Sequence, residues 1–295
     1  MHNTKGIVWL SSYPKSGNTW FRITLSRLLN RSPELCYIND IDKILGSRMV
    51  ANRVWMNKML GLDSTLLTDD EIDRLRPEAH RWYAGQAKRT IYIKTHDAYT
   101  LVDQKTPLFP AQGCLGAIYF IRNPLDVAIS LAHHVKCPLD WSIHMMGNSE
   151  FAIPFSDKFT DNRDKQLRQK LLSWSLHAQS WTAADLPINV LVLRYEDMIT
   201  APLETFAKGV QFLNLDISAT VLQKAIQDTS FDKLQQFEKS HGFKENPGHQ
   251  GQFFRKGIAG DWRETLNDAQ VEKIIQDHGD VMRQFGYLNE NNQPM

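Results

Sequence analysis

An early ten-residue segment, SSYPKSGNTW, has side chains that could bind an anion. It places the cation of Lys15 and the short polar residues Ser16, Asn18 and Thr19 around Gly17. A loop of this kind before a helix presents free backbone N–H groups and the positive end of the helix dipole to one spot. Phosphate or sulfate is therefore the first ligand to consider. The order differs from the triphosphate loop GxxxxGK[ST], because Lys15 precedes the glycine. A capped helix behind a buried strand would show part of the same pattern.

A second candidate anion site begins at Arg122. Asn123 is a good N-cap, Pro124 suits the first helical position, and Asp126 follows in the first turn. Ser130 lies two helical turns after Asn123, on the same side of the helix as Asp126. The Arg122 guanidinium can hold a phosphate with paired N–H donors, and Ser130 can add a hydroxyl. The alternative is a capped helix whose arginine pairs with a nearby carboxylate.

A candidate general base is His96, in Lys94-Thr95-His96. A lone histidine is usually structural, but this one directly follows an apolar run, with a lysine two residues earlier on the same face. A histidine that is neutral near pH 7 can accept a proton from a substrate. A nearby Lys94 would disfavour protonation of His96 and keep it neutral.

Four short apolar runs must position these groups, and helical patterns lie between them. The runs cover residues 7–10, 91–93, 117–121 and 189–193. Strands alternating with helices predict an α/β fold, a single domain over residues 1–295 with a central parallel sheet flanked by helices. The candidate anion sites then lie at the carboxyl edge of the sheet, where open α/β sheets bind ligands.

Three further stretches carry weaker expectations. Residues 40–90 read as a helical insertion packed over one end of the sheet, and residues 238–256 as a mobile loop. Residues 138–170 are rich in large apolar side chains, which either line an acceptor pocket or pack the core. The side chains concerned are Trp141, Met145, Met146, Phe151 and Phe155.

Composition excludes some function classes. With 34 Lys and Arg against 33 Asp and Glu, the formal net charge is +1, which gives no reason to expect nucleic-acid or membrane binding. No signal peptide is visible, and no apolar run approaches the roughly 20 residues that span a bilayer. Cys36, Cys114 and Cys137 are far apart and odd in number, which is typical of free thiols in a reducing cytoplasm.

Three segments together resemble the sulfotransferases that use 3′-phosphoadenosine 5′-phosphosulfate (PAPS). PKSGNTW is similar to their P-loop-like 5′-phosphosulfate loop. Arg122-Asn123-Pro124-x-Asp126 with Ser130 is similar to their 3′-phosphate site. FFRKGIAGDW, residues 253–262, resembles their C-terminal RKGxxGDW segment. PAPS carries phosphate at both positions, whereas ATP does not need the second site. Residues 18–20 and 39–42 are also similar to bacterial members.

The resemblance implies a set of donor-binding residues. Tyr195 matches a tyrosine that contacts adenine, and residues 229–231 match a segment that flanks it. Trp20 and Phe231 are candidates to stack on the base, although core packing is the commoner fate of such rings. The implied set is Lys15, Ser16, Gly17, Asn18, Thr19, Trp20, Arg122, Ser130, Tyr195, Thr229, Ser230, Phe231, Phe253, Arg255, Lys256 and Gly257.

The resemblance also implies direct in-line transfer of the sulfuryl group to a small hydroxylated acceptor. His96 would be the general base, Lys15 would stabilise the leaving oxygen, and Lys94 would stabilise the sulfuryl oxygens. Ser130 would hold Lys15 back until the acceptor arrives. No metal is needed, because the lysines supply the positive charge.

Alternatives remain at this point. His133, His134 and Cys137 have a ligand-like spacing but more plausibly line the acceptor pocket or end the helix. The dimer motif of animal members is altered, with Asn267-Asp268 in place of Thr-Val, so a monomer or another dimer stays open. A nucleotide-dependent kinase on a related fold, or a noncatalytic nucleotide-binding protein, would show some of the same features.

Overall fold

The structure is a computed structural model that describes residues 5–30, 38–46, 51–153, 166–246 and 251–295. Cys36 and Phe155 lie outside the described residues. Four parallel strands form the central sheet in the order β2-β1-β5-β8. They are β1 (Gly6–Ser12), β2 (Thr90–Thr95), β5 (Cys114–Ile121) and β8 (Val190–Arg194). The α/β class and the four predicted strands are confirmed.

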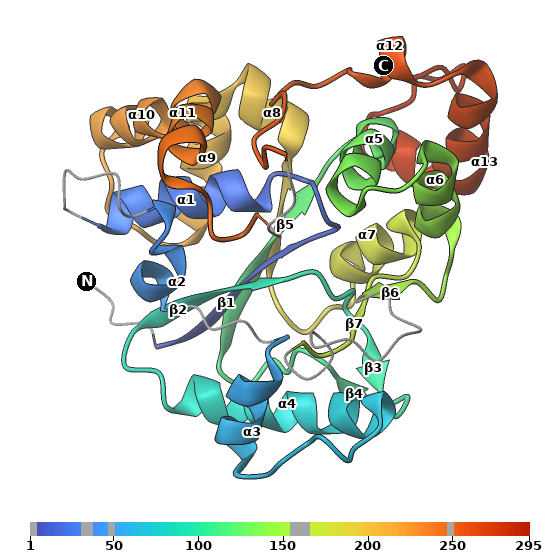
Figure 1. Cartoon of the computed structure of the whole chain (residues 1–295). Coiled ribbons are helices and arrows are strands. Elements are labelled where there is room, and N and C mark those ends of the chain that lie inside the picture. The colour runs from blue at the N-terminus through green and yellow to red at the C-terminus, as the bar shows by residue number, and fades with distance from the viewer. Residues whose placement is uncertain (1–4, 31–37, 47–50, 154–165, 247–250) are drawn as a thin grey trace.

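Helices cover both faces of the sheet (Figure 1). Side chains of β1 alternate between two cores: Ile7 and Trp9 enter one, Val8 and Leu10 the other. Burial on both faces explains why the strands read as continuous apolar runs. The first core packs against α5 (Pro124–Val135), α6 (Leu139–Gly147), α7 (Trp174–Thr182) and α13 (Asp268–Gln284). The second packs against α1 (Asn18–Leu29), α9 (Pro202–Phe212), α10 (Ala219–Asp228) and α11 (Phe231–His241).

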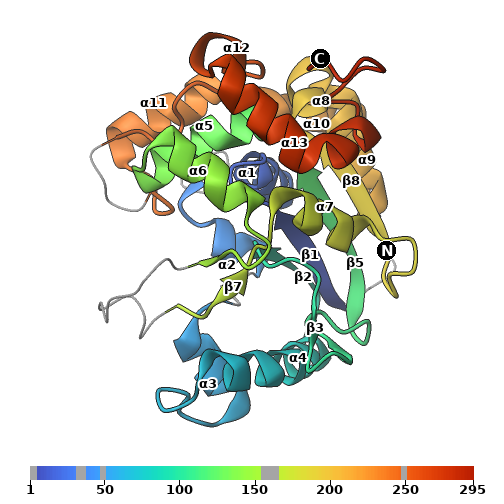
Figure 2. The ribbon, with the colours of Figure 1, turned by 90° about the vertical axis from the view of Figure 1, so that its right-hand side faces the viewer.

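The expected insertion is helical where the structure describes it. It contains α2 (Ile41–Leu45), α3 (Arg53–Leu60) and α4 (Asp69–Gly85). A capping box formed by Thr68 and Glu71 begins α4. Its last turn packs at the amino end of β5, where a Cβ on Gly113 would lie 2.5 Å from Ala84 Cβ. Figure 2 shows α3 and α4 at the end of the molecule opposite to α13 and the short α12 (Trp262–Thr265).

The remaining elements are short. Two small antiparallel pairs lie outside the main sheet, and α8 follows β8 directly. They are β3 (Leu101–Val102), β4 (Thr106–Pro107), β6 (Ala152–Ile153), β7 (Gln169–Lys170) and α8 (Tyr195–Thr200). Among the described residues, no helix combines the length and apolarity that crossing a bilayer requires.

The structure decides between the two alternatives for residues 138–170. Met146 and Phe151 are buried in the first core and Met145 packs against it, so these three side chains pack the core, whereas Trp141 is exposed. The expected loop at 238–256 is wrong in part: α11 continues to His241, and Phe243 and Phe254 are buried in the second core. Aromatic packing fixes this segment where the structure describes it, and residues 247–250 lie outside the description.

Candidate active site

A cavity of about 680 Å³ lies at the carboxyl edge of β1, β2 and β5. It brings together groups from segments far apart in the chain, as the topology of a parallel sheet requires. Of the predicted site residues, all but one line it: Lys15, Ser16, Gly17, Asn18, Thr19, Trp20, Lys94, His96, Arg122, Ser130, Tyr195, Ser230, Phe231, Phe253, Arg255, Lys256 and Gly257. The exception is Thr229.

The loop before α1 is closely packed. Gly17 is the N-cap of α1 at φ 95°, and a Cβ there would lie 2.8 Å from the Tyr195 ring. The Ser16 hydroxyl is buried without a hydrogen-bond partner among the described residues, which fits a ligand that supplies one. The Asn18 amide donates to Leu10 O at 2.8 Å. The Asn18 side chain therefore braces β1, and its backbone N–H is the group it can offer to a phosphate.

Lys15 is a half-buried cation that lines the cavity. Burial first, and then the charges of Lys94, Arg122 and Arg255, lower the pKa of Lys15 to about 8. Its ammonium lies 4.4 Å from the centre of the Phe253 ring. Among the described residues it makes no hydrogen bond to Ser130, and the restraint of Lys15 by Ser130 in the donor-bound enzyme stays a prediction.

Arg122 closes the second anion site from the end of β5. Its guanidinium donates to Lys15 O at 3.2 Å and to Ile258 O at 3.0 Å, and it stacks 4.2 Å from the Tyr195 ring centre. Its Nε is buried without a partner among the described residues. Asp126 lies 3.9 Å away, but its carboxylate accepts from Gly260 N at 2.7 Å. The carboxylate thus fastens the C-terminal segment to α5.

The C-terminal segment covers this site. Arg255 and Lys256 pair with Asp261, at 2.8 and 2.5 Å. Asp261 therefore holds the two cations together at the cavity wall. Gly257, at φ 64°, is pressed against Phe231, because a Cβ there would lie 2.2 Å from the ring.

Glu238, which was not predicted as a site residue, holds the backbone at the start of the C-terminal segment. It is a buried carboxylate that accepts from Phe253 N at 2.7 Å and from Phe254 N at 2.9 Å.

Trp20 forms one wall of the cavity. Its indole N–H donates to Thr229 O at 2.9 Å, which fixes the ring. The Thr229 hydroxyl is fully buried and bonds the Thr24 hydroxyl at 2.8 Å. A ligand contact by the Thr229 side chain is therefore not supported, and Thr229 acts through Trp20.

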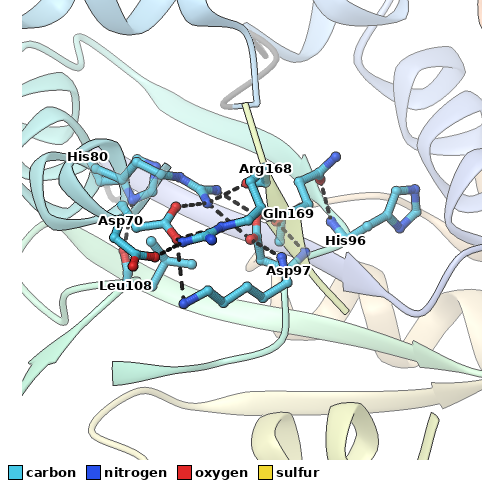
Figure 3. A network of polar contacts seen from close by, with 11 residues as sticks. Asp70, His80, His96, Asp97, Leu108, Arg168 and Gln169 are labelled. Carbon is cyan, nitrogen blue, oxygen red and sulfur yellow. Dashed lines mark hydrogen bonds and ion pairs between the residues drawn. The ribbon is translucent and has the colours of Figure 1, made fainter. Parts of the chain in front are cut away.

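The environment of His96 sets its tautomer and charge. Its Nδ1 lies 2.8 Å from Ser12 O, and because a carbonyl only accepts, Nδ1 carries the hydrogen and Nε2 keeps its lone pair. Burial first, and then Lys94, hold the pKa of His96 well below its ordinary value. The imidazole is therefore neutral near pH 7. Figure 3 shows its backbone N–H donating to Gln169 Oε1, at 3.2 Å.

Lys94 has a carboxylate partner that the sequence analysis missed. Its ammonium donates to Glu245 Oε2 at 3.1 Å, and Arg22, which is buried, holds Glu245 Oε1 at 2.8 Å. An ammonium has three donors, so two remain for an anion.

The histidines and the cysteine that were considered as metal ligands form no metal site among the described residues. His134 lines the main cavity, whereas His133 and His134 both line a small adjoining hollow of about 80 Å³. In the part of the chain that the structure describes, no three His, Cys, Asp or Glu side chains are grouped so as to hold a metal ion. Cys114 and Cys137 are free thiols.

Comparisons with known proteins identify the family of this chain. The family model described as a sulfotransferase domain matches residues 5–286. Sulfotransferase 1B1 from Canis lupus familiaris is 27% identical over 288 residues, covering 92% of this chain and 82% of the relative. Luciferin sulfotransferase from Photinus pyralis is 25% identical over 292 residues, covering 90% of this chain and 68% of the relative.

Two solved structures share the fold. Retinol dehydratase in complex with retinol and PAP superposes with a TM-score of 0.62 at 19% identity, covering 96% of this chain and 82% of that one. Mouse sulfotransferase SULT7A1 complexed with PAP gives 0.57 at 19% identity, covering 96% and 86%. A kinase finds no support among these matches. The chain therefore belongs to the sulfotransferase family, in the PAPS-dependent enzyme class that its three motifs predicted.

Proposed function

We propose that this enzyme transfers the sulfuryl group of PAPS to a hydroxyl of a small-molecule acceptor by direct in-line transfer. One observation carries the proposal: a neutral histidine with its Nε2 lone pair free shares a cavity with Lys15 and Lys94. Bound PAPS supplies a sulfuryl group on its 5′-phosphate and a leaving oxygen between sulfur and phosphorus.

The general base is His96. Its Nε2 takes the proton of the acceptor hydroxyl, and the hydrogen bond from Nδ1–H to Ser12 O keeps the ring oriented while the charge forms. Lys15 stabilises negative charge on the leaving oxygen, and Lys94 stabilises charge on the sulfuryl oxygens. Preorganised cations of this kind contribute several kcal/mol to a transition state. Because Lys15 and Lys94 supply the positive charge, the proposed transfer needs no metal ion.

Two walls hold the donor. The loop 15–19 binds the 5′ end, where the buried Ser16 hydroxyl lacks a partner among the described residues. Arg122, Ser130 and the Arg255–Gly257 segment bind the 3′-phosphate. Trp20 and Phe231 enclose the adenine. The two similar structures that are complexes with PAP support this assignment.

The acceptor is a small hydroxylated molecule with an apolar body. The cavity that His96 lines is also lined by the apolar side chains of Leu131, Val135, Ile153 and Leu171. The relative named for luciferin supports an acceptor of this kind. We further propose one cytoplasmic domain over residues 1–295, on the balanced charge and the unpaired thiols.

Calorimetric titration with adenosine 3′,5′-bisphosphate beside ATP–Mg²⁺ tests the donor site. We expect tight binding of the bisphosphate that is lost in Arg122→Ala and in Lys256→Ala. The control is Lys208→Ala, which changes an exposed lysine on α9 that pairs with Glu204 across one turn. Preference for ATP–Mg²⁺, or no nucleotide binding, would contradict the proposal.

A further inference from the structure

A buried ion pair directly follows the candidate base. Arg76, from α4, places its two terminal nitrogens 3.1 and 2.5 Å from the two carboxylate oxygens of Asp97. The Arg76 side chain is 1% exposed and the Asp97 side chain is not exposed at all. Such a fork-to-fork pair fixes both position and orientation.

The same pair holds the strand β7. Arg76 also donates to Arg168 O at 3.0 Å, and Asp97 Oδ1 accepts from Lys170 N at 3.0 Å. Ala98 N donates to Lys170 O at 2.7 Å. With the bond from His96 N to Gln169 (Figure 3), three hydrogen bonds join residues 96–98 directly to 169–170, and Arg76 bridges Asp97 to Arg168.

Further contacts hold residues 96–98 and 168–170 from two sides. Asp73, on α4, lies 3.4 Å from Arg76 and 2.6 Å from Arg168. On the other side His177 Nε2 contacts His96 O at 3.1 Å, and Trp181 donates to Asp97 O at 2.9 Å. The backbone that carries the imidazole is therefore held by α4, β7 and α7.

Residues next to the tied segment line the cavity. Leu171 follows β7, and Ile153 ends β6, which pairs with β7. Leu171 N also donates to Phe151 O at 2.8 Å, which joins the end of β7 to the start of β6. The β6–β7 pair thus forms a wall of the cavity, and Arg76 and Asp97 hold this wall in place relative to His96.

Stability alone does not account for this pair. Removing two charges from water costs several kcal/mol per ion, and packed apolar side chains of similar volume are often as stabilising. A buried pair can instead specify one arrangement of the chain among several of similar energy. Here the pair would specify the position of His96 relative to the wall formed by Ile153 and Leu171.

We propose that Arg76 and Asp97 are positioning residues that keep the imidazole of His96 and the acceptor wall at Ile153 and Leu171 in one fixed register. They touch neither donor nor acceptor. The proposal rests on the proposed role of His96 as general base. According to this proposal, the network affects the reaction with the acceptor and leaves donor binding unchanged.

The test compares three variants with the wild type. Arg76→Lys keeps the charge but loses the fork, Gln169→Ala removes one hydrogen bond from the His96 backbone, and Arg76→Met with Asp97→Leu removes both charges. Arg81→Lys is the matched control, because Arg81 lies on α4 and pairs with the exposed Glu78. Folding is checked by circular dichroism, donor binding by bisphosphate calorimetry, and turnover by steady-state kinetics with PAPS.

We expect Arg76→Lys and the double variant to lose at least about tenfold in kcat/KM for the acceptor, with bisphosphate affinity unchanged. Gln169→Ala should show a smaller loss of the same kind, and it decides the question if the other variants do not fold. Full turnover in folded variants, or a parallel loss of bisphosphate affinity, would overturn the proposal. His96→Ala is measured beside them: if it stays active, the base assignment itself fails.

Discussion

Gly257 offers a sharp test of the nucleotide site. A methyl group there would lie 2.2 Å from Phe231 Cδ2 and 2.5 Å from Cγ, whereas real Cβ contacts are essentially never below 3.0 Å. The ring or the segment must therefore move by about 1 Å, a displacement large enough to disturb a binding geometry. At φ 64° an alanine also carries roughly 1–2 kcal/mol of left-handed strain.

Gly257→Ala should weaken binding of adenosine 3′,5′-bisphosphate at least about tenfold, or about 1.4 kcal/mol, in calorimetry. The matched control is Gly61→Ala, at φ 66° and ψ 29° with no heavy atom within 4 Å of the added methyl. It carries left-handed strain without the collision, so its affinity should equal that of the wild type. Equal affinities in the two variants would refute the contact between Gly257, Phe231 and the base.

Three further results are expected. Because burial lowers the pKa of Lys15 to about 8, bisphosphate affinity should fall as pH rises through that value, and Lys15→Arg should flatten the profile measured by calorimetry. An unchanged slope in Lys15→Arg would assign the titration to another group. Lys94→Met should lower kcat by about 10²-fold or more in a PAPS assay while bisphosphate affinity stays constant, since the bisphosphate lacks the sulfuryl group. Thr229→Val should cost about 1 kcal/mol in the free energy of unfolding measured with urea, by removing the buried bond to Thr24, and a loss of nucleotide affinity without that cost would restore a ligand role to its hydroxyl.

The sheet and the loops that line the cavity were predictable from local patterns. Strands buried on both faces read as unbroken apolar runs, and a helix start after a strand shows its cap and its polar loop in consecutive residues. Asn123 caps α5 as its type and place predicted, its side chain accepting from Leu125 N at 3.1 Å.

The partners of the charged groups were not predictable in this way. Glu245 pairs with Lys94 although 151 positions separate them in the sequence, and no local pattern links the two residues. Asp97 looks like an ordinary polar residue after a strand until α4 brings Arg76 against it. The expected ligand contact of Thr229 overlooked that its hydroxyl could be used by Thr24 inside the fold. Tertiary contacts decide such choices, and the sequence of one segment does not carry them.

The most direct test of the account is sulfuryl transfer itself. The purified protein is incubated with PAPS and a panel of small apolar phenols and alcohols, and products are followed by mass spectrometry beside the His96→Ala variant. We predict a product that carries one added sulfuryl group and is lost in His96→Ala, while that variant still binds the bisphosphate. Equal product formation by His96→Ala, or PAPS binding with no sulfated product from any acceptor, would contradict the account.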